Sequence, residues 1–130
     1  MGNSGDAVSG YAAVSGATDA PRDAEAKIFA RVISTLKVAA TKSKDGDVKS
    51  LAEAIHLNAR LWVALMTDLV QEGNKLPAEL KVRLLELGKF SLAHGQKVLN
   101  NEGEIQQLID VNTSVMRGLR NKPADSEATS

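Results

Sequence analysis

The stretch that most constrains the fold is residues 58–90, where two apolar segments of helical periodicity are separated by a short corner. The corner, residues 73–77 (GNKLP), places Gly73 where a helix would end and Pro77 where the next would begin. A connection this short predicts that the two helices run antiparallel and lie side by side. The chain is therefore expected to be built around a helical hairpin.

Both helices of this hairpin have broad apolar faces. The first is expected to start at Asp47 or Ser50 and to end near Glu72, and the second to run from Pro77 to about Leu99. A helix that is apolar over more than one stripe is covered from more than one side. Small side chains recur at helical spacing along the second helix and predict a shallow groove for another helix, at Gly88, Ser91 and Gly95.

Two helices with narrower apolar stripes precede and follow the hairpin, over residues 18–40 and 104–119. The sequence has no strand signal and no internal repeat. It therefore predicts an all-α fold, a small bundle of about four helices in which a central helix 2–helix 3 hairpin is flanked by helices 1 and 4. This helical domain is expected to span residues 18–120, between a flexible N-terminal segment (1–17) and a disordered C-terminal tail (121–130).

Composition excludes several classes of function. Sixteen basic and sixteen acidic residues give a net charge of zero, so the chain has no overall attraction to nucleic acid or to anionic lipid. The absence of cysteine excludes disulfides and thiolate chemistry. The first residues lack the pattern of a secretory signal, and no apolar run approaches the ~20 residues that a membrane span needs. We expect a cytoplasmic protein without membrane insertion or direct contact with nucleic acid.

No pattern in the sequence predicts catalysis, a cofactor or a metal ion. The two histidines, His56 and His94, fall on the polar sides of their helices and are expected to be solvated. No two carboxylates are expected to share an apolar environment. Asn58 and Asn112 interrupt apolar stripes, and a buried amide needs hydrogen-bond partners. They are expected either to bond to each other or to loop backbone, or to cap the backbone of a partner.

Several short patterns occur in a fixed order along the chain. They are Tyr11 followed by T-x-x-P-R-x-x-E at 18–25, N-x-x-L-W at 58–62 with Asp68, N-x-L-P-x-x-L at 74–80 in a leucine-rich stretch ending at Phe90, and L-I-D-V-N at 108–112 with Gly-Leu at 118–119. Together they resemble the FlaF family of flagellar biosynthesis regulators of alphaproteobacteria, over about residues 11–120. Ser91 and Thr113 depart from that pattern, which leaves these two sites without a family role.

The resemblance implies a non-enzymatic flagellar biogenesis factor without a cofactor. It would bind flagellin in the cytoplasm as a chaperone for type III export, by way of a terminal helical segment of flagellin, and would support flagellin synthesis. The alternative is a post-transcriptional regulator of flagellin translation that acts through the partner regulator FlbT. A third possibility is a dimer that buries surplus apolar surface between its own copies.

We expect the partner-binding surface to lie on the hairpin. The predicted contact residues are Trp62, Leu65, Leu76, Leu84, Leu87 and Phe90. Trp62 is also a candidate core residue, since a large aromatic side chain in a central stripe usually packs inside. Phe90 falls on the far side of its helix among charged residues and is predicted to be exposed.

Overall fold

The computed structural model describes residues 19–120, with side chains from residue 24 onward. It consists of four helices: α2 (Asp19–Lys44), α3 (Val48–Leu69), α4 (Ala78–Leu99) and α5 (Ile105–Arg120). No strand occurs in this range. The prediction of an all-α bundle of about four helices is confirmed. The predicted N-terminal segment, including Tyr11, and the predicted C-terminal tail lie outside the described residues.

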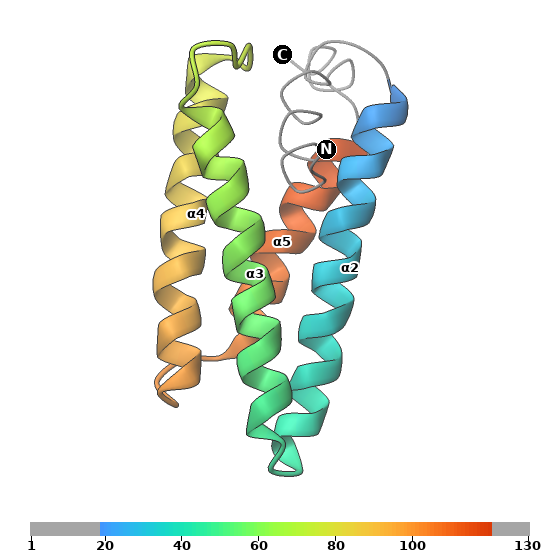
Figure 1. The fold of residues 1–130 in the computed structure, drawn as a ribbon, viewed down its shortest axis with the longest axis vertical. Coiled ribbons are helices and arrows are strands. Elements are labelled where there is room, and N and C mark those ends of the chain that lie inside the picture. Colours follow the sequence, from blue (N-terminus) through green and yellow to red (C-terminus); the bar gives the residue numbers. More distant parts are fainter. Residues whose placement is uncertain (1–18, 121–130) are drawn as a thin grey trace.

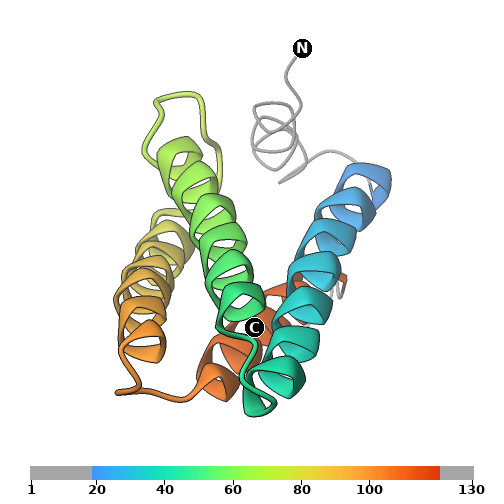
Figure 2. The same ribbon diagram turned by 60° about the horizontal axis from the view of Figure 1, so that its bottom comes forward.

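The hairpin predicted from the short corner is formed by α3 and α4. Helix α3 packs against α2 as well as α4, and α5 packs against both α4 and α2. The hairpin is thus flanked by α2 and α5, as predicted, but these two helices also pack extensively against each other. Helices α2 and α3 are close at their connecting loop and diverge toward the other end of the bundle (Figures 1 and 2).

The ends of the helices follow local chemistry. Asp47 caps α3 by accepting a hydrogen bond from the backbone N–H of Ser50 at 3.0 Å, and the Ser50 hydroxyl donates to the same carboxylate at 2.8 Å. These bonds, the backbone one above all, lower the pKa of Asp47. The preceding Gly46 has a φ of +92°, a left-handed conformation that favours glycine. Helix α3 ends at Leu69, three residues earlier than the predicted Glu72, so the corner is longer than expected.

The interior contains two apolar clusters. The first includes Phe29 and Trp62, whose rings meet edge to face with centroids 5.9 Å apart. The second is centred on aliphatic side chains of all four helices, among them Leu36, Ile55, Val98 and Leu108. Every helix of the bundle contributes to each cluster, so the apolar faces of α2 and α5 are covered within the chain.

The predicted groove of small residues is filled by α3. A Cβ atom added at Gly88 would lie 2.8 Å from Met66 Cγ and 3.0 Å from Trp62, and one added at Gly95 would lie 3.1 Å from Ile55. Ser91 is fully buried and bonds to Asn58 of α3. The groove therefore brings α3 and α4 together and is not open to a partner.

Candidate partner-binding surface

The six predicted contact residues have three different environments. Helices of the bundle bury four of them, namely Trp62, Leu65, Leu76 and Leu84. Leu87 is half-buried against the first apolar cluster. Phe90 is 41% exposed, in agreement with the prediction from its position on α4. Of these six residues, only Phe90 and part of Leu87 can reach a partner.

Trp62 belongs to a buried polar network that links three helices. Its indole Nε1 donates to Asn112 Oδ1 of α5 at 2.8 Å, and Asn112 Nδ2 donates to Asn58 Oδ1 at 2.7 Å. Asn58 Nδ2 in turn donates to Ser91 Oγ of α4 at 2.9 Å. The two asparagines are thus bonded to each other, the first of the predicted alternatives. Both are almost completely buried, so neither amide is available to cap a partner's backbone.

Phe90 is supported by a histidine that was predicted to be solvated. The rings of Phe90 and His94 stack with centroids 5.1 Å apart and 13° between their planes. His94 is only 7% exposed, and its Nε2 lies 2.8 Å from the carbonyl oxygen of Glu104. The prediction for His94 was wrong because the turn before α5 folds back over this part of α4. A Cβ at Gly103 would lie 2.8 Å from the imidazole, so the turn needs a residue without a side chain there.

Two carboxylates are buried at the wide end of the bundle, Glu25 of α2 and Asp68 of α3. Burial, reinforced by the negative charge of Asp68, raises the pKa of Glu25 from 4.5 to about 8. Burial also raises the pKa of Asp68, although a hydrogen bond of 3.2 Å from Asn74 Nδ2 opposes that rise. The expectation that no carboxylates share a buried environment was wrong.

The same cluster holds the corner between α3 and α4 in place. Asn74 Oδ1 accepts from the backbone N–H of Leu76 at 3.0 Å, and the Asn74 carbonyl oxygen accepts from Lys81 Nζ at 2.8 Å. The positions of the two acids along their helices indicate that both are buried. Glu25 lies one turn before Phe29, and Asp68 lies three residues after Leu65, so both acids fall within the buried stripe of their helix.

The large apolar side chains that remain exposed are concentrated on the hairpin. They are Val38, Val48, Val63, Val70, Leu80, Val82, Phe90 and Leu99. All but Val38 belong to α3, its C-cap residue or α4. The broad apolar faces of these helices, read from the sequence, thus exceed what α2 and α5 cover.

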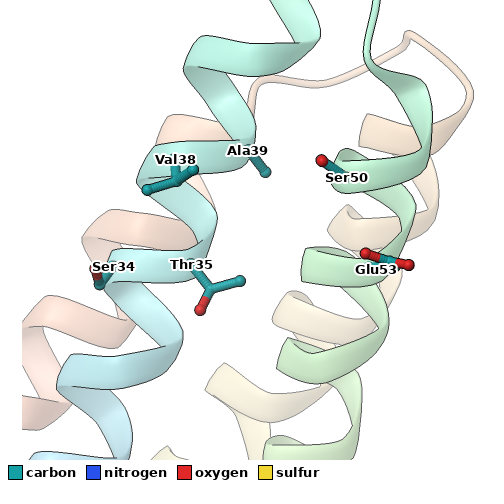
Figure 3. Close-up of a pocket in the computed structure, with 6 residues that line it drawn as sticks. All are labelled: Ser34, Thr35, Val38, Ala39, Ser50 and Glu53. Carbon is teal, nitrogen blue, oxygen red and sulfur yellow. The ribbon is translucent and has the colours of Figure 1, made fainter.

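A shallow pocket of about 250 Å³ lies between α2 and α3, near the loop that joins them (Figure 3). It is lined by Ser34, Thr35, Val38, Ala39, Ser50 and Glu53. Two of its hydroxyls already have partners, because Thr35 donates to the carbonyl of Arg31 and Ser50 donates to Asp47. The lining offers one charged group and no convergent set of polar atoms, so we assign no ligand to it.

Other kinds of site are not found in the part of the chain that the structure describes. There, no three His, Asp or Glu side chains are grouped so that they could hold a metal ion. None of the four described helices has both the length and the apolar character needed to cross a membrane. The polar side chains in the interior bond to one another, as the network around Trp62 shows.

These features define a small helical bundle with surplus apolar surface on its central hairpin. The family model for flagellar protein FlaF matches residues 7–119, nearly the whole chain, and the protein therefore belongs to the FlaF family. Searches of curated proteins and of solved structures returned no match.

Proposed function

We propose that this protein binds flagellin in the cytoplasm as a non-enzymatic export chaperone and thereby supports flagellin synthesis. Membership of the FlaF family assigns the chain to flagellar proteins. The proposal of a flagellin chaperone rests on the concentration of exposed apolar side chains on α3 and α4. Surfaces of this kind are typical of proteins that cover an amphipathic segment of a partner.

The proposed partner segment is a terminal helical segment of flagellin. Such a segment presents one apolar face, which must be shielded until the subunit is assembled. A chaperone that binds the helix along its own apolar surface removes that face from water without any chemical step. Phe90 and Leu87 are proposed as direct contacts, since they retain accessible surface. The four buried residues of the predicted set would hold α3 and α4 in position.

Calorimetric titration of the full chain with its cognate flagellin tests this proposal. Intact flagellin is expected to bind, and flagellin without its C-terminal helix is expected to lose most of the affinity. Equal binding of both forms would move the contact to another segment. Absence of binding to either form would reject the chaperone function and favour regulation through FlbT, which the same titration with purified FlbT would test.

A further inference from the structure

The line along which α3 and α4 touch has two sides. Residues on its inner side are buried in the bundle, and residues on its outer side face away from the interior. On α4 the line passes through Gly88 and Gly95, since a Cβ at these positions would meet Met66 and Ile55 of α3. At 100° per residue, the positions on the inner side of this line are 84, 91 and 98, and all three are buried. The positions on the outer side are 85, 92 and 99, which are all leucine.

Helix α3 presents a matching set of outer positions. Met66 lies on the contact line, and Val63 and Val70 lie beyond it, away from the buried Asn58 and Leu65. We call the combined surface the outer strip, which consists of Val63, Met66, Val70, Leu85, Leu92 and Leu99. Met66, Leu85 and Leu92 are half-buried. The other three residues are exposed, with exposed fractions of 51% for Val63, 65% for Val70 and 38% for Leu99. Along α4 the strip extends about 21 Å, or about four turns of a helix.

The charged side chains beside the outer strip are mostly basic. On α3, Arg60 occupies the helical position next to the strip, and Lys89 does so on α4. Lys49 lies on the same side of α3, 14 residues before Val63. Lys81 lies in line with Leu85. The acidic residues on this side of the two helices are Glu53 on α3 and Glu86 on α4, and both lie farther around their helices from the strip than Arg60 and Lys89 do. An apolar strip with this rim is complementary to an apolar stripe flanked by carboxylates.

We propose that the outer strip binds an amphipathic helix that carries Asp or Glu residues on both sides of its apolar stripe. This inference rests on the proposed function, so the occupant is a helical segment of flagellin. A second copy of this chain would bring the same basic rim against itself, which like-charge repulsion disfavours. Phe90 lies on the opposite side of α4 from Leu85 and Leu92, so it contacts a different part of the same partner.

Two matched substitutions test the apolar part of the site. Val63 in the strip and Val38 on α2 are both 51% exposed and both lie inside helices, so replacement by Asp is matched in exposure and in helix propensity. In titrations with intact cognate flagellin, Val63→Asp is expected to lower affinity on the order of tenfold or more, and Val38→Asp less than about twofold. Circular dichroism melting of both variants checks that the bundle is intact.

The outcomes separate the two proposals. If wild-type protein binds flagellin and Val63→Asp binds equally well, or if both variants lose affinity equally, the outer strip is rejected and the chaperone function stands. If wild-type protein does not bind, the chaperone function itself fails. Light scattering gives a further check, because a wild-type dimer that Val63→Asp converts to a monomer would show that a second copy covers the strip.

The charge complementarity is tested by reversing the charge of two basic residues beside the strip. The double variant Arg60→Glu/Lys89→Glu is expected to weaken flagellin binding on the order of tenfold, with a difference from wild type that shrinks as salt is raised. The control Lys27→Glu/Arg31→Glu changes the net charge equally on the exposed side of α2 and is expected to have an effect of less than about twofold. Unchanged or tighter binding of the rim variant would overturn the assignment of a carboxylate-flanked helix.

Discussion

The buried carboxyl of Glu25 makes stability depend on pH in the direction opposite to that of a salt-bridged acid. Its pKa is about 8 in the folded protein, against an ordinary value of 4.5, so the folded state retains a proton that the unfolded chain has lost. Between these two values the unfolded state binds fewer protons, and stability therefore falls as pH rises. With these two pKa values, the free energy of unfolding falls by about 2–4 kcal/mol between pH 5 and pH 8. The raised pKa of Asp68 acts in the same direction.

The variant Glu25→Gln isolates this contribution, because glutamine has nearly the same shape and cannot ionise. We expect the wild-type free energy of unfolding to decrease from pH 5 to pH 8 and that of Glu25→Gln to decrease much less, with only the contribution of Asp68 remaining, so that the variant is the more stable protein at pH 8. Urea denaturation followed by the fluorescence of Trp62, the single tryptophan and a fully buried one, measures both. The exposed Glu53→Gln is the matched control and should keep the wild-type slope.

A wild-type stability that is constant or increases between pH 5 and pH 8 would refute a raised pKa of Glu25. The same slope in Glu25→Gln and in the wild type would also refute it, because the pH dependence would then arise from other groups.

Three further predictions concern packing and binding. Asn112→Ala leaves buried partners of both its amide groups without a hydrogen bond and is expected to cost about 2–4 kcal/mol in urea denaturation, so a loss below about 1 kcal/mol would contradict the network's role. Gly88→Ala forces a methyl group against Met66 and is expected to destabilise the bundle by about 1–3 kcal/mol, whereas Gly118→Ala, with no neighbour within 4 Å, should be neutral or stabilising; equal melting temperatures would argue against this close packing. Phe90→Ala is expected to weaken flagellin binding with only a small drop in melting temperature from loss of the stack on His94, and a large drop in that temperature would show that Phe90 is a core residue.

Helical periodicity predicted the fold because each helix has its own start and stop signals and a coherent apolar face. Asp47 caps α3, and Pro77 immediately precedes α4. The early end of α3 at Leu69 was not predicted, because the bonds that hold the corner run between Asp68 and Asn74 and depend on the fold of the loop.

The contact surface was harder to predict from sequence, for a physical reason. A broad apolar face shows that a helix has more than one neighbour, but it does not show whether that neighbour belongs to the same chain. Trp62 meets Phe29 of α2, the Gly88 position of α4 and Asn112 of α5, and Leu84 belongs to the same apolar cluster. Both are therefore core residues, although the same periodicity made them candidate contacts. Phe90 was placed correctly because its position falls outside the apolar arc of α4. His94 shares that polar side, yet a turn from elsewhere in the chain covers it.

The short patterns that resemble the FlaF family describe the inside of the bundle more than its surface. Asn58, Trp62 and Asn112 form the central network, and Asp68 and Asn74 fix the corner. These residues hold α3 and α4 in the geometry that places the outer strip on one side and Phe90 on the other.

Two classes of variant should therefore behave differently. Substitution of an interior residue such as Asn112 is expected to lower the melting temperature and flagellin affinity together, because the surface is lost with the bundle. Substitution in the outer strip, such as Val63→Asp, is expected to lower affinity alone. In a plot of affinity against melting temperature, the interior variants should lose both together along a sloping line. The outer-strip variants should differ in affinity at an unchanged melting temperature. A single common line would mean that binding depends only on the amount of folded protein, and that the outer strip has no contact of its own.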